Sequence, residues 1–398
     1  MDVQSRAQEM ADGLVASGAE VGLQIAAYLH GELIVDVHAG KADASTGRPV
    51  DGLTLFHVPD MGLVATVVHV LAERGLIEYG APVAAYWPEF GAHGKTDITV
   101  AHVLTHSAGV PQAPTGLVPE DFAEWDALCA RVADLRPLWR TGTAVGVHVL
   151  TFGIILAEVV RRVTGHPITD VLRDWVTAPL GIADELFFGV PAQHLPRLVR
   201  MEGHHLSDPL VRFPEGSLFQ SVVPPAWRDG AELANRTEYE ALSMPCSGRG
   251  TARALARMYA AMIGEVDGVR LISAERTSRL SSTVTVRQDR VLGGPLPRGL
   301  GFEVASVATG HPTAFGDPNN CGVAFADPTR SLTVAVLFNL LTLRLPAPGY
   351  EIADEIRAVL GLEPRLIQAI RRRQSDRRIR RFRRRSARRR GRAWTPAD

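Results

Sequence analysis

Two regions rich in β-forming residues lie near opposite ends of this chain, and a long helical region separates them. The first covers about residues 20–58 and the second about residues 300–340, while apolar spacing favours helices over about residues 99–265. The β-rich runs occupy residues 21–28, 32–37, 53–58, 302–307, 322–326 and 332–339. We therefore predict an α+β fold, in which a sheet assembled from both ends is flanked by helices and a helical insertion.

The clearest helical pattern begins directly after the first β-rich region. Apolar residues recur three and four positions apart from Leu63 to Leu71, which is typical of a helix with a buried face. Asp60 precedes this run and Gly75 follows it, and these residue types favour the N-cap and the end of a helix. The sequence predicts a buried helix over residues 61–74 that opens just after a strand.

The net charge of zero conceals an uneven distribution. Residues 371–398 hold fourteen arginines and two acids, a charge of +12, which leaves −12 on residues 1–370. A segment so charged and so poor in apolar residues cannot bury enough surface to offset the entropy lost on folding. We expect one folded domain over residues 1–370 and a disordered arginine-rich tail. The tail either binds an anionic partner (nucleic acid, membrane or acidic protein) or is a solvated appendage lying on the acidic body.

Cysteine usage and hydropathy indicate the compartment. Cys129, Cys246 and Cys321 lie far apart, which argues against a disulfide framework and against a CxxC metal site. Neither a secretory signal nor an apolar run of about 18 residues is present, so we expect a cytoplasmic protein. His204-His205 has the composition of a metal site, but adjacent side chains point in different directions. No nucleotide-binding or zinc motif occurs, and we expect no metal and no cofactor.

Several sequence blocks between about residues 10 and 362 follow the pattern of one family. They are VVHVLAERGL at 67–76, APVAAYWPEF at 81–90, ITVAHVLTHSAGV at 98–110, GTAVGVHVLT at 142–151, GTARALAR at 250–257 and FADP at 325–328. Together they resemble the serine β-lactamase (class C)-like and family VIII esterase group. The resemblance implies a β-lactamase/transpeptidase-like fold with an antiparallel sheet. It also implies a serine nucleophile at a helix start, a lysine and a tyrosine that handle its proton, and a backbone oxyanion hole.

The chain departs from this family at the nucleophile and its base. It has no Ser-x-x-Lys sequence, because its only lysines, Lys41 and Lys95, are preceded three positions earlier by His38 and Ala92. The family's serine opens the helix that we expect over residues 61–74.

Two alignments of that segment are open. Asp60 is the best candidate for the place of the serine, in which case the lysine has no counterpart. An alignment without a gap from the helix side instead puts Val58 and Met61 at the two positions. Both alignments remove the serine and the lysine.

Two further catalytic positions are also changed. Val147 stands where the resemblance expects the tyrosine. The later segment that in these esterases follows Gly-His-x-Gly-x-Gly-Gly has Asp317 in place of the histidine and Cys321 in place of a glycine. Losses in separate segments, with the scaffold blocks kept, favour a real loss of acyl-enzyme chemistry.

We expect these replaced positions to meet in one pocket. Two carboxylates in one cleft can separate their pKa values and act as acid and base, so Asp60 and Asp317 are the candidate catalytic residues. The candidate binding residues are His57, Met61, Val147, His148, Ser247, Arg249 and Cys321.

Simpler interpretations of these residues stay open. Asp60 would then be a helix N-cap, and residues 317–320 an ordinary loop. Cys321 would be a substitute nucleophile, with His148 or His57 as its base, or a small buried residue that opens a strand.

The sequence supports three hypotheses of function. The first is a degenerate member of the family that binds a small ester-, lactone- or polyketide-like molecule, or acts on it by non-covalent acid–base chemistry. The second is an active carboxylesterase or lipase-type hydrolase with a different nucleophile. The third is a non-catalytic scaffold protein.

Overall fold

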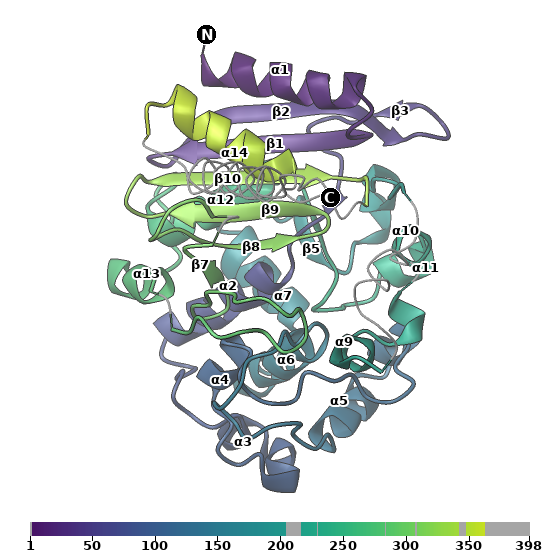
Figure 1. The fold of residues 1–398 in the computed structure, drawn as a ribbon, viewed down its shortest axis with the longest axis vertical. Coiled ribbons are helices and arrows are strands. Elements are labelled where there is room, and N and C mark those ends of the chain that lie inside the picture. The colour runs from purple at the N-terminus through teal and green to yellow at the C-terminus, as the bar shows by residue number, and fades with distance from the viewer. Residues whose placement is uncertain are drawn as a thin grey trace, which may run out of the picture.

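The computed structural model describes residues 2–203, 216–228, 230–282, 284–306, 309–341 and 348–362. Figure 1 shows a sheet with helices on both faces and a mostly helical region beside it. The arginine-rich tail over 371–398 and the pair His204-His205 lie outside the described residues. Within the described ranges, no helix combines the length and the apolar character needed to cross a membrane.

The main sheet has seven strands in the order β3-β2-β1-β10-β9-β8-β7. Each neighbouring pair is antiparallel. The strands are β1 (Gly22–Leu29), β2 (Glu32–Asp43), β3 (Arg48–Pro49), β7 (Glu303–Val304), β8 (Phe315–Asn319), β9 (Gly322–Asp327) and β10 (Leu332–Phe338). The first and last parts of the chain thus meet where β1 pairs with β10, as the two β-rich regions predicted.

Helices cover both faces of this sheet. Helices α1 (Val3–Ala16) and α14 (Pro348–Val359) cover one face, while α12 (Ala252–Ile263) packs against β1, β9 and β10. Along β10, Val334 and Val336 belong to the core under α1 and α14, and Ala335 and Leu337 belong to the core on the α12 side. The alternation of side chains along a strand explains why β10 is buried on both faces.

A second, three-stranded sheet has the order β4-β6-β5. It consists of β4 (Phe56–His57), β5 (Leu186–Phe188) and β6 (Gly248–Gly250). The expectation that residues 53–58 add to the main sheet is therefore wrong. Only β4 is a strand in this segment, and it pairs with β6, nearly 200 residues away in sequence.

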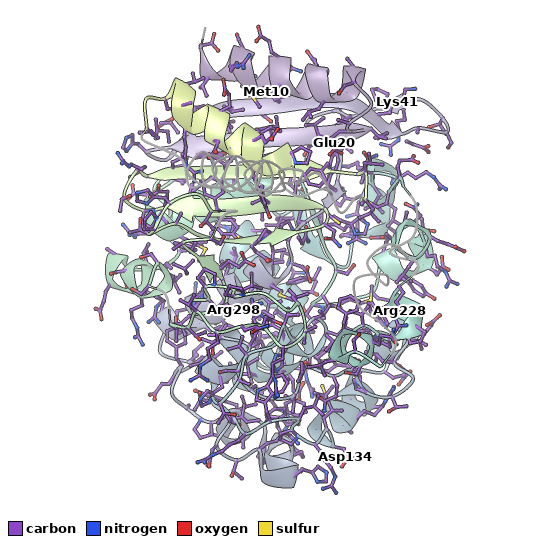
Figure 2. The ribbon with its side chains drawn as sticks, viewed as in Figure 1. Met10, Glu20, Lys41, Asp134, Arg228 and Arg298 are labelled. Atoms are coloured by element: carbon purple, nitrogen blue, oxygen red, sulfur yellow. The ribbon has the colours of Figure 1, made fainter. Side chains whose placement is uncertain are left out.

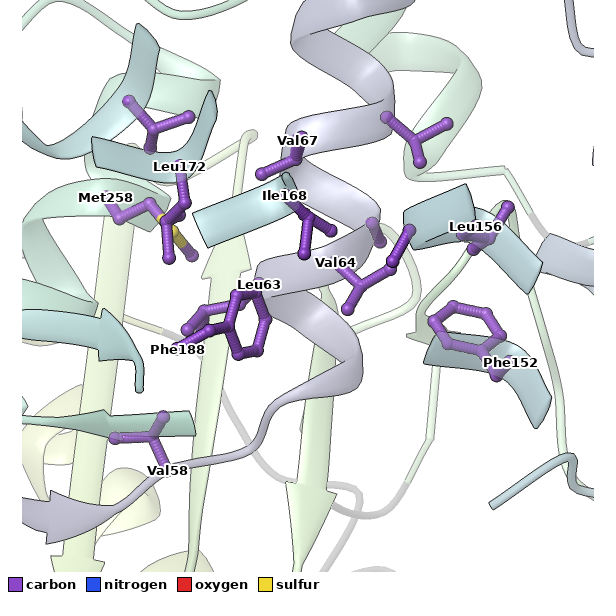
Figure 3. Packing of buried hydrophobic residues seen from close by; sticks show 14 of the residues in the cluster. Val58, Leu63, Val64, Val67, Phe152, Leu156, Ile168, Leu172, Phe188 and Met258 are labelled. Carbon is purple, nitrogen blue, oxygen red and sulfur yellow. The ribbon is translucent and has the colours of Figure 1, made fainter. Parts of the chain in front are cut away.

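Helix α2 (Met61–Glu73) lies between the main sheet and the helical region. Eleven of its thirteen residues are buried, so it is a central helix and not an amphipathic surface helix. Figure 3 shows Leu63, Val64 and Val67 packing among side chains of the helical region and of α12. Each such buried side chain stabilises the fold by about 1.5–3 kcal/mol, which fixes the position of the first turn of α2.

The remaining described elements form the helical region and the connections. The α-helices are α3 (Val83–Tyr86), α4 (Val100–Leu104), α5 (Trp125–Ala133), α6 (Thr151–Thr164), α7 (Ile168–Leu172), α9 (Leu218–Val222), α10 (Ala231–Ala234), α11 (Thr237–Glu240) and α13 (Ala274–Leu280). The short helices are η1 (Pro88–Gly94), η2 (Pro119–Ala123), η3 (Arg173–Thr177), η4 (Ala192–Arg197) and η5 (Pro225–Trp227).

Strand β8 corrects the interpretation of residues 317–320 as a loop. Asp317 and Pro318 lie in register with Ala324 and Val323 of β9, and Asn320 and Cys321 make the turn between the two strands. Pro318 is tolerated because the N–H that proline lacks would point away from β9, so the β8–β9 pair loses no hydrogen bond. Asp317 is therefore fixed by a strand pair.

Candidate functional site

The first turn of α2 is capped by a residue from the main sheet. Asp60 occupies the N-cap position but its side chain makes no capping hydrogen bond. The N–H of Gly62 instead donates to Oδ2 of Asp317 at 2.8 Å. The N-terminal N–H groups of a helix have no partner within the helix and favour negative charge, so Asp317 caps α2 from β8. This leaves the Asp60 carboxyl group available for another role.

Asp60 and Asp317 both have raised pKa values. Burial raises the pKa of Asp60 to about 6, against the opposing charge of Arg249. Burial and the negative charge of Asp60 raise the pKa of Asp317 to about 8, against the Gly62 hydrogen bond. Both side chains stay partly exposed. At neutral pH Asp60 is mostly ionised and Asp317 mostly protonated, the states required of a base and an acid.

The small sheet and the residue before β6 bring His57, Ser247 and Arg249 close to one another. His57 lies opposite Arg249 in the β4–β6 pair. Nη2 of Arg249 donates to Oε1 of Glu240 at 2.7 Å, and Nη1 donates to Oγ of Ser247 at 3.0 Å. Burial and the charge of Arg249 hold the pKa of His57 well below its usual range, so His57 is neutral.

Glycine lets the small sheet approach Asp60 closely. A Cβ on Gly248 would lie 2.8 Å from Cγ2 of Val58 and 3.4 Å from Cβ of Asp60. The Val58 N–H also donates to the Gly248 carbonyl at 3.1 Å. The sheet that carries Arg249 therefore packs directly against the segment that carries Asp60.

An apolar cluster lies on the other side of the first turn of α2. Val147 and Val291 are buried in it, and Met61 packs against them. The cluster brings together two residues that the sequence placed in the pocket, Met61 and Val147. Val147 stands where the family pattern expects a tyrosine, and Met61 stands where one alignment expects a lysine. Both positions therefore carry apolar side chains.

Two cysteines flank Asp60, and raised pKa values keep both thiols protonated at neutral pH. Burial raises the pKa of Cys321 to about 12. Burial and the charge of Asp60 raise the pKa of Cys246 well above its usual range. Since the thiolate is the reactive form, this environment suppresses the chemistry expected of a substitute Cys321 nucleophile. Cys246 was not among the sequence candidates, although it precedes Ser247.

His148 was expected to line the pocket, and the structure corrects this expectation. Its side chain is fully buried. Nδ1 lies 2.7 Å from the Gly146 carbonyl, and Nε2 accepts from the Val110 N–H at 3.2 Å. Both ring nitrogens are used by the backbone, so His148 holds two loops together and has no nitrogen left for a ligand.

Neither lysine of the chain can serve as the family's base. Nζ of Lys95 donates to the carbonyls of Ala92, Ala133 and Leu135 at 2.6–2.8 Å. Lys41 lies where β2 pairs with β3, at one end of the sheet (Figure 2). A buried amine that donates to three carbonyl groups is structural, and Lys41 stands on an element away from α2.

The position of Gly62 bears on the two alignments of the segment before α2. A Cβ on Gly62 would collide with the hydroxyl of Tyr259, so only glycine fits there. The family pattern continues as Ser-x-x-Lys-Gly, and equating its glycine with Gly62 puts Met61 at the lysine and Val58 at the serine. This geometry favours the alignment without a gap, in which Asp60 is an additional carboxylate between Val58 and Met61.

Glu303 and Arg298 extend the charged part of the site, and sequence reasoning missed both. Glu303 pairs with Gly316, the residue before Asp317, and burial raises its pKa. Arg298 forms a buried ion pair with Asp289 at 3.1 Å and lies near the middle of the molecule in Figure 2. No motif marks either residue, because β7 reaches the site only through its pairing with β8.

The described residues contain no group of three or more His, Cys, Asp or Glu side chains that could hold a metal ion.

Comparison with known proteins places this chain in a family. The sequence model described as Beta-lactamase matches residues 7–355. The chain belongs to the beta-lactamase family. The esterase/beta-lactamase LipL of Mycobacterium tuberculosis is 34% identical over 341 residues, which cover 80% of this chain and 77% of LipL. Esterase EstB of Burkholderia gladioli is 28% identical over 78% of this chain and 83% of EstB.

Solved structures of family members have the same architecture. A family VIII carboxylesterase superposes with a TM-score of 0.80 at 31% identity, covering 89% of this chain and 97% of the other. A penicillin-binding protein homolog from Caulobacter crescentus gives a TM-score of 0.79 at 28% identity, covering 90% and 98%. The α+β fold and the family resemblance predicted from the sequence are confirmed.

Proposed function

We propose that this beta-lactamase family protein has replaced acyl-enzyme chemistry with non-covalent acid–base chemistry on a small ester-, lactone- or polyketide-like molecule. The single observation that carries the proposal is the pair of partly exposed carboxyl groups at the start of α2, with pKa values of about 6 and about 8. Two neighbouring carboxyl groups with separated pKa values can work as base and acid in one step.

The step that suits this pair is proton transfer next to a carbonyl group. The Asp60 carboxylate takes a proton from the carbon beside the carbonyl, and the C–H bond pair becomes the C=C bond of an enol. Asp317 gives its proton to the carbonyl oxygen, whose π pair forms the new O–H bond. Isomerisation, cyclisation and dehydration all begin with such a step, and none needs a covalent intermediate.

Electrostatics favours neutral or cationic ligands. The arginines whose charges act on Asp60 and Asp317 are Arg249 and Arg298. Arg249 forms an ion pair with the buried Glu240, and Arg298 forms an ion pair with the buried Asp289. A ligand carboxylate beside Asp60 would meet a like charge while both arginines are paired with other carboxylates, and like charges repel strongly where water is partly excluded.

The apolar cluster of Met61, Val147 and Val291 adds a second requirement. It borders the same first turn of α2 that holds the carboxyl pair. A ligand with a hydrocarbon arm and a carbonyl group would match both halves of the site.

Hydrogen–deuterium exchange tests the proposal without knowledge of the natural ligand. The protein is incubated in D2O with aliphatic lactones and with a β-keto lactone, and NMR follows exchange of the protons beside the carbonyl. We expect catalysed exchange, and Asp60→Asn should reduce it by roughly 10²–10⁴-fold, the usual contribution of a general base. The matched control is Asp184→Asn, which changes an exposed carboxylate and should leave exchange intact.

Ester hydrolysis is the second candidate, and the names of LipL and EstB favour it. It predicts turnover of nitrophenyl butyrate and a stoichiometric covalent adduct with a fluorophosphonate probe, measured by intact mass. Turnover lost in Cys321→Ala would replace the acid–base proposal. A protein with no exchange, no turnover and no stabilisation by any lactone would instead fit the scaffold hypothesis.

A further inference from the structure

The hydroxyl group of Tyr259 is buried next to the carboxyl pair with no hydrogen-bond partner. Tyr259 lies within α12, and its side chain is 0% exposed. Its ring packs against Phe302 and Phe315, with centroids 6.0 and 6.3 Å away. No atom of the described residues forms a hydrogen bond with its hydroxyl oxygen. Buried hydroxyl groups normally have a partner, so an orphan one requires a reason.

The hydroxyl points at the place where α2 meets β8. A Cβ on Gly62 would collide with Oη of Tyr259 and would lie 3.3 Å from Cβ of Asp317. The phenol, the first turn of α2 and the Asp317 side chain therefore meet at one point. Gly62 has no side chain, and this absence is what lets the phenol reach so close to Asp317.

We propose that Tyr259 is a positioning residue for Asp317, which holds the ionised form of that carboxyl group by donating a hydrogen bond from its hydroxyl. This inference rests on the acid–base function proposed above for Asp317. When Asp317 gives its proton to the ligand, the resulting carboxylate keeps the N–H of Gly62 as a donor and gains the O–H of Tyr259 as a second one. Hydrogen bonds to a carboxylate are roughly twice as strong as neutral ones.

Tyr259 keeps its own proton throughout this step. Burial and the nearby Asp317 raise the pKa of the phenol well above its usual range, so it remains a donor at every working pH. The other charged groups that act on Asp317 are Asp60, Glu303 and Arg298. They lie before α2, on β7 and in the segment before β7, and the Tyr259→Phe exchange leaves all three unchanged.

The deciding experiment is a titration of the Asp317 carboxyl carbon by NMR in the ligand-free protein, assigned with Asp317→Asn. Tyr259→Phe removes one oxygen and keeps the ring. We expect the pKa of Asp317 to rise by about half a unit or more, since losing a donor to the charged form disfavours it. The control is Tyr79→Phe, which removes a hydroxyl bonded to His69 at 2.6 Å and should not move the pKa. An unchanged pKa of Asp317 in Tyr259→Phe would overturn the inference.

A second variant tests the geometry at Gly62. Gly62→Ala would push the phenol away from Asp317, and it should raise the same pKa and lower the melting temperature. Combined with Tyr259→Phe, the alanine should be better tolerated and should raise the pKa no further. If the two changes acted independently on the pKa, the contact between the phenol and this turn would be unimportant. Because both readouts use the ligand-free protein, they can succeed even if the proposed reaction is wrong.

Discussion

The protein places carboxyl groups out of full contact with water in two regions, and their environments differ. In the helical region Glu158 is 0% exposed and accepts hydrogen bonds from Arg161, Arg162 and Trp125 at 2.7–2.9 Å. Burial alone would raise its pKa, but these donors outweigh burial and lower it. At the start of α2, Asp60 has no capping bond and Asp317 accepts from one N–H, and both pKa values rise.

This difference separates a structural carboxylate from the two carboxyl groups that we propose to be functional. A carboxylate that is fully paired is fixed in one charge state and stabilises the fold. A carboxyl group left with few partners is less stable when ionised, and it can change its charge near neutral pH. We infer that this loss of stability at the start of α2 persists because Asp60 and Asp317 have a function.

The largest expected effect comes from breaking the paired region. Glu158→Ala would remove the acceptor that Arg161, Arg162 and the Trp125 N–H share, and would leave Arg161 paired only with Asp126 and Arg162 only with Glu89. Removing one partner of a buried charge network lowers stability by about 3–5 kcal/mol. Urea unfolding followed by far-UV circular dichroism measures the loss. Lactone exchange in the surviving folded fraction should be unchanged, and a specific loss of exchange would mean that the two regions are not independent.

The second effect concerns the pH dependence of stability. The pKa of Asp60 rises on folding from 3.8 to about 6, and that of Asp317 from 3.8 to about 8. A carboxyl group with a raised folded pKa holds its proton more tightly in the folded chain, so stability falls as pH rises from about 4 toward the folded pKa. At about 1.4 kcal/mol per unit, Asp60 alone lowers stability by on the order of 2–3 kcal/mol above pH 6.

Asparagine substitutions test the direction in which stability changes with pH. Asp60→Asn and Asp317→Asn should each flatten the decrease in stability between pH 4 and 8, and each should be at least as stable as the parent protein at pH 8. Glu158→Gln should act in the opposite direction, because a lowered pKa gives stability that is lost as pH falls through it. A steeper decrease in either aspartate variant would contradict the raised pKa values.

A smaller effect concerns ligand charge. We expect a neutral lactone to raise the melting temperature by a few degrees at concentrations well above its Kd. Its ring-opened hydroxy acid should give no shift, because the carboxylate would meet Asp60 with no free arginine beside it. Stronger stabilisation by the hydroxy acid than by the lactone would show that Arg249 or Arg298 is available to anions.

The smallest effect concerns the thiols. Cys321→Ser should leave exchange activity unchanged, and labelling of Cys321 by a thiol reagent at pH 7 should be slow, because the pKa is raised to about 12. Rapid labelling in the native protein would reopen the nucleophile hypothesis for this residue.

Local sequence patterns predicted the fold better than they predicted the site. The helix over residues 61–74 and the β-rich runs 21–28 and 32–37 follow from spacing and residue type. Helix α2 and strand β1 appear within a residue or two of their expected bounds, while β2 runs on to Asp43. Strand β8 was missed because Pro318 and two asparagines indicate a loop, while its pairing with β9 is a tertiary effect.

The site itself depended on contacts that no motif encodes. The resemblance placed Asp60 and Asp317 together, and the structure brings them to the same turn of α2. The resemblance could not show that both ring nitrogens of His148 bond to the backbone, or that Tyr259 and Glu303 lie beside Asp317. The partner of the arginine-rich tail and the cytoplasmic location stay predictions.

The most direct test of the central claim is the titration of both aspartates in the unmodified protein. With carboxyl-carbon NMR and assignments from Asp60→Asn and Asp317→Asn, we predict one midpoint near 6 and one near 8. Because Asp60 helps to raise the pKa of Asp317, removing Asp60 should lower that of Asp317. Two midpoints near the ordinary value of 3.8, unaffected by each other, would contradict the account.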